Sequence, residues 1–295
     1  MTTVSYVYPN VASLKQRGGF DERWRLAREH GCAYIEVPAD FIKNRTEVRA
    51  TGLDLCAVPD RAAIEKLYDG DSVFRDEAHS ILHTEPSLRR TDGYGISAQA
   101  PLKWYDAGWR ERFVQMVLDV SDVLGRPADL IEVHPGDRRN TTQDIIGSVV
   151  SLLDAYEGAF GMRPAVMLEN RTGQCIQEGR EIRKLADDVA ARGDDLLASF
   201  GCVLDVQQLH TVTKERCFAS FDLVPPAFLR GFHIHRKHGT PSVGDPIPWE
   251  RICAKIGTFD HPVIINPEVH HKNKVGETIG FCRGMVGGGK PSPQW

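Results

Sequence analysis

The sequence predicts a (β/α)₈ TIM barrel, in which a closed parallel sheet is surrounded by helices. Short apolar segments that suit strands alternate with amphipathic segments that suit helices, and this alternation is typical of parallel sheets. Together with the first strand, the chain of 295 residues holds about eight such units, the number that a closed barrel needs. A doubly wound open sheet is the alternative, but no G-x-G-x-x-G turn follows the first strand, so a dinucleotide-binding sheet has less support.

The composition, with 41% hydrophobic and 26% charged residues, fits one globular domain. We expect a barrel domain over residues 1–287 and a flexible tail over residues 288–295. The seven cysteines form no C-x-x-C pair and are interpreted as reduced thiols. No signal peptide or membrane span is predicted, so we expect a cytoplasmic protein. The net charge of −4 neither indicates nor excludes a polyanionic partner, and the oligomeric state stays open.

Strands are predicted in the first half of the chain where short apolar runs occur, at 4–8, 34–37, 81–83 and 130–133. Helices are predicted where apolar residues recur every three or four positions, at 20–30, 64–68 and 109–124. Gly31 and Gly125 follow two of these helices and are typical helix-terminating residues. The segment 91–108 has neither period and is long enough for a functional loop on the barrel rim.

The second half of the chain continues the same alternation. Strands are predicted at 165–169, 202–206, 228–235 and 263–269. Helices are predicted at 142–156, around the apolar positions of 182–189, and at 249–256 and 277–285.

Six of the predicted strands end in ionisable residues. Side chains alternate between the two faces of a strand, so if Val166 and Leu168 face the covering helices, Glu169 faces inward. The same reasoning places one set of side chains inside the barrel: His83 and Glu85, Glu132 and His134, Glu169, Asp205, His233 and His235, and Asn266 and Glu268. Glu85 and Glu132 are the weaker members, because their orientation depends on where their strands end. The carboxyl ends of barrel strands meet at the face that carries the active site.

Carboxylates and imidazoles that converge in this way destabilise one another unless a cation lies between them. Mixed histidine and carboxylate ligation suits Zn²⁺, and also Mn²⁺ or Fe²⁺, whereas Mg²⁺ and Ca²⁺ prefer oxygen ligands alone. One inward histidine or aspartate in a barrel is more often a hydrogen-bonded structural residue. Six strands that end alike favour a divalent metal site, for which Zn²⁺ is the first choice and Mn²⁺ the second.

Basic residues follow the same strand ends and would attract a phosphate-bearing substrate, although ordinary solvated loop charge explains any one of them equally well. They are Arg138, Arg139, Arg171, Arg236, Lys237, Lys272 and Lys274. Four further histidines are interpreted as loop or surface residues, namely His210, His261, His270 and His271.

The segments LIEVHPGD, MLENRTGQ, VLDVQQ and LRGFHIH, in this order, resemble the endonuclease IV family (AP endonuclease family 2) of the xylose isomerase-like barrel superfamily. The similarity extends over residues 34–269 and is densest over 129–236. The resemblance implies a xylose isomerase-like barrel and a zinc-dependent phosphodiesterase that acts at abasic sites in DNA, with three clustered metals.

Residue by residue, the resemblance implies that His83, His134 and a bridging Glu169 hold the first metal. Glu169, Asp205, His233 and an acidic group of the last strand would hold the second. In the simplest register Asn266 occupies the position of the expected glutamate, and Glu268 lies two residues further on the same side. The third metal position departs from the family pattern, because Gln208, Arg236 and His238 stand where its ligands are expected.

Three functional hypotheses follow. The first is a metal-dependent hydrolase of abasic DNA, preferred because isomerase chemistry does not require HPG or TGQ. The alternative is an isomerase or epimerase of a sugar or sugar phosphate, which needs only Glu169, Asp205, His233 and Glu268, and the Gly- and Pro-rich segment 238–249 resembles a loop of such relatives. In both, Glu169 and Glu268 are the expected catalytic residues. The expected substrate-binding residues are Arg171, Gln208, His235, Arg236, His238 and Asn266. The third hypothesis is a barrel that binds a ligand without catalysis.

Overall fold

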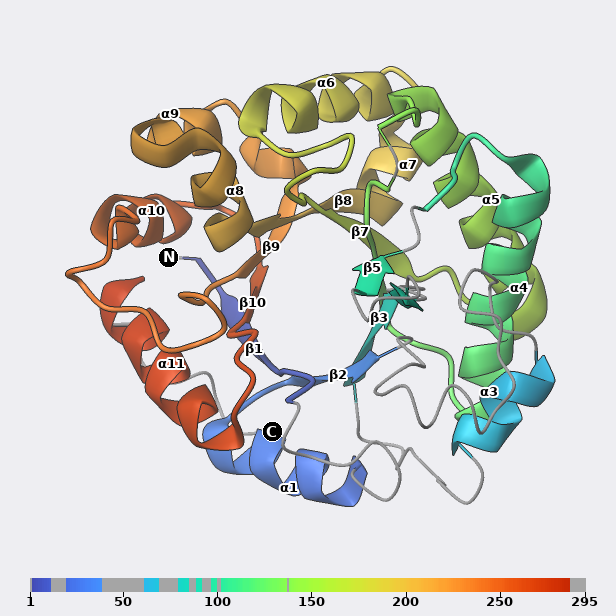
Figure 1. The fold of residues 1–295 in the computed structure, drawn as a ribbon, viewed down its shortest axis with the longest axis horizontal. Coiled ribbons are helices and arrows are strands. Elements are labelled where there is room, and N and C mark those ends of the chain that lie inside the picture. The colour runs from blue at the N-terminus through green and yellow to red at the C-terminus, as the bar shows by residue number, and fades with distance from the viewer. Residues whose placement is uncertain are drawn as a thin grey trace.

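The computed structural model describes residues 2–11, 20–38, 61–68, 79–84, 89–91, 97–99, 102–136 and 138–286. Its parallel strands close into a barrel in the order β1-β10-β9-β8-β7-β6-β3-β2, and helices surround the barrel (Figure 1). The predicted fold class is therefore confirmed. The predictions for Glu85 and for the tail 288–295 lie outside the described residues.

The barrel strands are β1 (Val4–Tyr8), β2 (Tyr34–Pro38), β3 (His79–Thr84), β6 (Leu130–Val133), β7 (Ala165–Glu169), β8 (Phe200–Asp205), β9 (Leu229–His233) and β10 (Val263–Asn266). The last strand is shorter than predicted. Pro267 follows it and has no N–H with which to continue the ladder. Strands β4 (Arg89–Thr91) and β5 (Ser97–Gln99) form a separate antiparallel pair. The segment predicted as a loop at 91–108 therefore contains strand residues at 91 and 97–99, and a helix begins at Ala107.

The helices that surround the barrel are α1 (Phe20–His30), α3 (Arg61–Tyr68), α4 (Ala107–Val123), α5 (Thr142–Phe160), α6 (Gly179–Ala190), α7 (Asp194–Ser199), α8 (Val206–Thr213), α9 (Cys217–Asp222), α10 (Trp249–Ile256) and α11 (Lys272–Met285). Short 3₁₀ turns occupy Lys214–Arg216 and Pro226–Phe228. Helices α7, α8 and α9 were not predicted. Helices α7 and α9 have six residues each, too few to show a helical period, and α8 starts at Val206, which was assigned to the preceding strand. Within the described residues no helix is long and apolar enough to cross a membrane.

Helix ends are fixed by local side chains. The carboxylate of Asp106 accepts a hydrogen bond from the backbone N–H of Trp109 and caps α4. Thr141 and Asp144 form a reciprocal capping box at the start of α5, which ends at Gly161 with φ of 68°. The loops that enter and leave these helices are thereby held in place.

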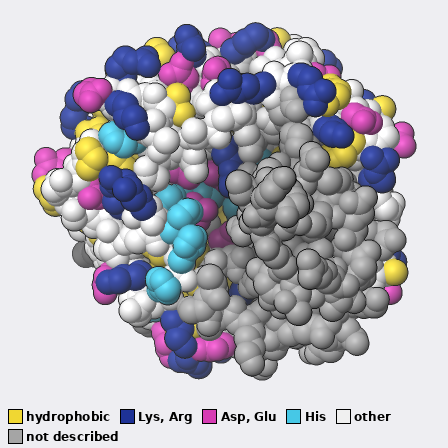
Figure 2. Space-filling model, in the orientation of Figure 1, with side chains coloured by type: hydrophobic (Ala, Val, Ile, Leu, Met, Phe, Trp, Pro, Cys, Tyr) yellow, Lys and Arg dark blue, Asp and Glu magenta, His cyan; other side chains and the backbone are white. Residues whose placement is uncertain are grey.

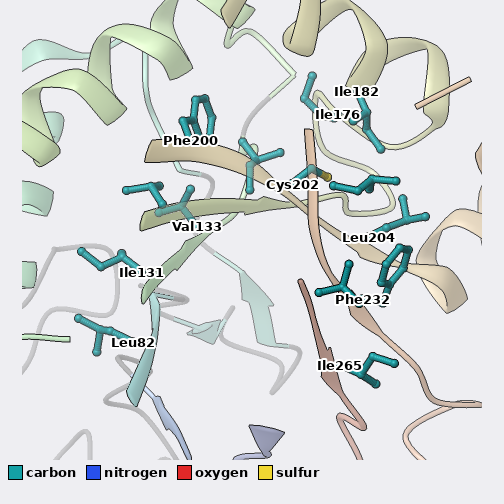
Figure 3. Packing of buried hydrophobic residues seen from close by; sticks show 14 of the residues in the cluster. Leu82, Ile131, Val133, Ile176, Ile182, Phe200, Cys202, Leu204, Phe232 and Ile265 are labelled. Carbon is teal, nitrogen blue, oxygen red and sulfur yellow. The ribbon is translucent and has the colours of Figure 1, made fainter. Parts of the chain in front are cut away.

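The apolar core has two layers. The larger layer lies between the sheet and the helices and includes Val166 and Leu168, whereas Met167 lies in a small cluster with Val7, Ile81 and Val203 inside the barrel. Figure 3 shows members of the outer layer, among them Cys202 and Leu204 of β8 beside Ile182 of α6. The predicted alternation along β7 is confirmed, and Glu169, two residues beyond Met167, faces the barrel interior.

Candidate metal centre

Glu169 ends β7 and stands at the centre of the barrel mouth, with only 1% of its surface exposed. Its Oε2 atom lies 2.7 Å from Nε2 of His134, 3.6 Å from Nε2 of His83 and 3.8 Å from Nδ1 of His233. Figure 2 shows histidine and acidic side chains gathered at the centre of this face, over the barrel axis of Figure 1. Side chains from three other strands thus converge on one carboxylate oxygen.

His83, His134 and Glu169 form the first candidate metal group, and they come from the neighbouring strands β3, β6 and β7. The Nε2 atoms of the two histidines are 3.3 Å apart. Trp104 donates a hydrogen bond of 2.9 Å from its indole to the backbone oxygen of His134 and fixes that backbone. All three side chains are buried, so solvent does not hydrate their polar atoms, and a cation would complete their coordination.

Asp205, His233 and Glu268 form the second candidate group, on β8, on β9 and two residues after β10. Oε2 of Glu268 lies 3.4 Å from Nδ1 of His233. Among the described residues, neither this oxygen nor either nitrogen of His233 has a hydrogen-bond partner. A buried polar atom without a partner costs about 1–3 kcal/mol. A cation bound among these atoms would remove that cost, so the residues fit a divalent metal.

Glu132, one of the weaker sequence candidates, also reaches this centre. Its Oε1 atom lies 3.1 Å from Nε2 of His233 and 3.5 Å from Nε2 of His83, and it has no hydrogen bond among the described residues. Glu132 is therefore placed between the two groups and is a further candidate ligand.

His235, His238 and Glu268 also bring ligand atoms close together, but their geometry does not suit a metal. The rings of His235 and His238 are stacked with planes only 8° apart, so their in-plane lone pairs do not converge. The backbone N–H of His238 donates to Nδ1 of His235, which leaves the proton of His235 on Nε2. That Nε2 lies 3.4 Å from Oδ2 of Asp205 and 2.9 Å from Oε2 of Glu268. We assign His235 as a hydrogen-bond donor to Asp205, and its approach to Glu268 is a close polar contact without hydrogen-bond geometry.

The pKa values of the centre are perturbed in opposite directions. Burial, with the negative charges of Glu268 and Asp205, raises the pKa of Glu169 well above its usual value. Burial opposes ionisation of Glu268 too, but His235 and His233 outweigh it and lower the pKa of Glu268. A metal bound at the centre would displace the protons that its carboxylates and imidazoles hold in the metal-free protein.

For two histidines burial disfavours the charged ring, but nearby carboxylates outweigh it. Glu132, Glu36 and Glu169 raise the pKa of His83 to about 10. Asp205 and Glu268 act on the pKa of His235 in the same direction. The backbone N–H of His238 donates to Nδ1 of His235, so this nitrogen cannot hold a proton and we assign the neutral ring.

Glu36 is a buried member of the centre that the sequence analysis missed. It lies on β2, is 4% exposed, and its Oε1 is 2.5 Å from Nδ1 of His83. Alternation along YIEV could have revealed it, because Glu36 faces inward when Ile35 and Val37 face the helices. The predicted metal ligands all end apolar runs, whereas Glu36 lies inside its run.

The predicted substrate-binding residues occupy different places. Arg171 reaches the centre, with NH1 3.0 Å from Nε2 of His134. Gln208 accepts from the backbone N–H of Thr172, and Arg236 donates to Gln207, so both contact neighbouring loops.

His238 stacks on His235 and on His270. Asn266 bonds to Glu36 and to the backbone N–H of Glu268. Contact of Arg171, Gln208, His235, Arg236, His238 and Asn266 with a substrate stays a prediction.

The surface assignment of histidines is confirmed for His270 and His271, which are exposed. It was wrong for His210, which is 8% exposed within α8. The error arose because α8 was not predicted, and the packing of this helix buries the ring of His210.

The HPG and TGQ segments contact each other. The backbone N–H of Gly136 donates to Oε1 of Gln174, and the backbone N–H of Cys175 donates to the oxygen of Gly136 at 3.2 Å. Gly136 has φ of 76°, and a Cβ atom there would lie 2.5 Å from the oxygen of Leu102. These motifs hold two loops of the barrel mouth together, a structural role that requires no nuclease activity.

No family model matches the chain. D-allulose 3-epimerase from Methylomonas sp. has a similar structure, with 13% identity, coverage of 97% of this chain and 98% of that chain, and a TM-score of 0.56. For 3-keto-D-glucoside 4-epimerase from E. coli the identity is 12%, the coverage 96% and 100%, and the TM-score 0.53. For IOLI protein with a bound zinc atom the identity is 11%, the coverage is 96% of this chain and 95% of that chain, and the TM-score is 0.53.

At these identities the similarities establish the fold alone, a (β/α)₈ TIM barrel. The structural neighbours named as enzymes are sugar epimerases, and they give no specific support to the predicted endonuclease IV resemblance.

Proposed function

We propose that this protein is a divalent-metal-dependent epimerase or isomerase of a sugar or sugar phosphate. One observation carries the proposal: Glu169, Asp205, His233 and Glu268 lie at the ends of four successive barrel strands and approach one another. Nδ1 of His233 is 3.8 Å from Oε2 of Glu169 and 3.4 Å from Oε2 of Glu268. Sugar epimerases among the structural neighbours support the same class of reaction.

The mixture of imidazole and carboxylate ligands suits Zn²⁺ first and Mn²⁺ second. When bound, such a metal would polarise an oxygen of the substrate and make the neighbouring C–H more acidic. The zinc of the IOLI protein is consistent with this choice.

The two glutamates have the roles of base and acid. One carboxylate removes the proton from the carbon beside the substrate carbonyl, and the electron pair moves onto the carbonyl oxygen to give an enediolate. The other glutamate, protonated beforehand as a carboxylic acid, gives its proton to the opposite face of the same carbon, and this yields the epimer. Glu169 and Glu268 follow different strands and both approach Nδ1 of His233, and we assign them to opposite faces of a bound sugar.

Arg171 is the proposed group that orients the substrate. Its guanidinium already lies within 3.0 Å of Nε2 of His134, and it offers several donors to hydroxyl or phosphate oxygens. The rim arginines of the same face would favour a phosphorylated sugar.

Proton exchange tests the proposal directly. The metal-loaded protein is incubated in D₂O with a panel of ketoses, aldoses and their phosphates, and NMR follows deuterium incorporation beside the carbonyl. We expect incorporation and a new sugar epimer or isomer, both abolished by a chelator and restored by Zn²⁺ or Mn²⁺. Inertness across the panel with a loaded metal would contradict the proposal.

A metal-dependent hydrolase acting on abasic DNA is the second candidate. His83, His134 and Glu169 form an additional metal group that proton transfer does not need, and this observation favours hydrolysis. A chelator-sensitive cut in an abasic-site duplex, with two or more metal ions per chain, would support it. One metal per chain with no cut favours the epimerase, and a chain purified without chelator that carries no metal favours a binding protein.

A further inference from the structure

Glu36 is engaged through both carboxylate oxygens, although the proposed reaction does not use it. Oε1 lies 2.5 Å from Nδ1 of His83. Oε2 accepts from the backbone N–H of Asn10 at 2.8 Å and from the side-chain amide of Asn266 at 3.2 Å. Arg23 holds the same region, because it donates to the backbone oxygen of Glu36 and to the side chain of Asn10. The carboxylate plane is fixed by partners on three elements.

The first oxygen sets the tautomer of His83. An ionised carboxylate only accepts hydrogen bonds, so Nδ1 of His83 carries the proton that bridges to Glu36. Nε2 is then directed into the centre, where His134 Nε2 is 3.3 Å away and Glu169 Oε2 is 3.6 Å away, and a metal that displaced the second proton would use its lone pair. A carboxylate behind a histidine in this way orients the ring and makes it a stronger metal ligand.

Oε2 of Glu36 is connected through Asn266 to Glu268, a member of the second candidate metal group. The side-chain nitrogen of Asn266 donates to Glu36, which leaves the side-chain oxygen of Asn266 directed toward Glu268. This oxygen accepts a hydrogen bond of 3.1 Å from the backbone N–H of Glu268. Glu268 has φ of 26°, an unfavourable value for a residue other than glycine. The bond from Asn266 stabilises this conformation, which brings the carboxylate of Glu268 to His233.

We propose that Glu36 is a positioning residue that orients one ligand of each candidate metal group, His83 directly and Glu268 through Asn266. The inference rests on the proposed function, because it requires a metal at the centre. Glu36 and Asn266 contribute no metal ligand themselves.

The variant Glu36→Gln tests the direct contact. The N–H groups of Asn10 and Asn266 would bind the amide oxygen, so the amide nitrogen would face His83. That nitrogen donates, which moves the His83 proton to Nε2, where a metal ligand needs its lone pair. We expect the affinity for Zn²⁺ and Co²⁺ to fall roughly 10- to 100-fold and the Co²⁺ absorption spectrum to change. Long-range ¹H–¹⁵N NMR of the zinc-loaded protein should show that Nδ1 of His83 no longer carries the proton.

Asn266→Ala is the second variant and removes only the hydrogen bonds that connect Glu36 to the backbone of Glu268 through Asn266. We expect weaker metal binding with the wild-type tautomer of His83. Glu178→Gln is the matched control, because Glu178 is also a buried carboxylate but caps α6, and it should leave metal affinity unchanged. Thermal melts establish that each variant is folded.

The outcomes separate this inference from the proposed function. A wild-type protein that binds no metal overturns both. A wild-type protein that binds metal, with the same affinity and His83 tautomer in Glu36→Gln, overturns the role of Glu36 alone. If Glu36→Gln does not fold, wild-type metal affinity in Asn266→Ala overturns the coupling to Glu268.

Discussion

Oε2 of Glu169 lies 2.7 Å from Nε2 of His134, at the junction of the two candidate metal groups. His134 belongs to one group, and Glu169 also approaches His233 of the other. A carboxylate with two oxygens can serve both groups at once, so the chemistry of the site depends most strongly on this side chain.

Glu169→Gln should therefore impair both metal binding and proton transfer. An amide is a weak ligand and cannot act as a general base, so we expect the deuterium exchange rate to fall by about 10²–10⁴-fold. Metal analysis and the exchange assay, with Glu178→Gln as the control, measure the two effects. An unchanged rate with unchanged metal content would exclude Glu169 from the site.

Chelation should lower the thermal stability of the protein. Glu132, Glu169 and His233 are buried and have close polar contacts but few hydrogen bonds, so a bound cation stabilises the folded state. At a free metal concentration 100 times Kd this amounts to about 2.7 kcal/mol. Calorimetry with and without chelator, followed by readdition of Zn²⁺, measures it. Identical melting temperatures in all three samples would argue against a metal at these residues.

His235→Phe should weaken metal binding while preserving the stacking on His238. The phenyl ring cannot donate to Asp205, whose Oδ2 lies 3.4 Å from Nε2 of His235. Loss of such an outer contact costs roughly 10- to 100-fold in metal affinity. Calorimetric titration with Zn²⁺ measures the metal affinity of the variant. His261→Phe is the control, because His261 bonds to Leu229 at the opposite end of β9. Equal affinities in both variants would contradict the role of His235.

His210 should make the protein less stable in mild acid. Burial, with the charges of Lys214 and Arg236, lowers the pKa of His210 below its usual value of 6.5. Below pH 6.5 the unfolded chain binds a proton that the folded chain resists, so this stability is present above pH 6.5 and is lost as pH falls through the folded pKa. Urea unfolding from pH 7.5 to 5 measures the loss. It should be smaller in His210→Gln, and an equal loss would disprove the assignment.

Gly136→Ala should destabilise the loop at HPG. Its φ of 76° disfavours alanine, and the new Cβ would lie 2.5 Å from the oxygen of Leu102. The backbone conformation alone costs roughly 1–3 kcal/mol, and the clash adds to it. Gly161→Ala is the matched control, since Gly161 has φ of 68° but nothing within 4 Å. Urea midpoints compare the two, and equal destabilisation would show that the contact with Leu102 is unimportant.

Local pattern determined much of the architecture. The helix at Phe20–His30 and the strand at Ala165–Glu169 begin and end as predicted, because their periodicity and terminating residues lie within the segments themselves. The side chains of β7 that face the barrel interior could also be predicted from the sequence, since the alternation of side chains is a property of the single strand.

Contacts between distant segments decided the rest. The sequence by itself determined a barrel with His83, His134, Glu169, Asp205 and His233 at strand ends, because each orientation depends on near neighbours. Only the tertiary structure decided that Glu268 approaches His233 while Asn266 bonds to Glu36, since this depends on the backbone after Pro267 and on a strand 230 residues away. Barrel closure brings β2 and β10 to opposite sides of β1, and no local pattern records that proximity.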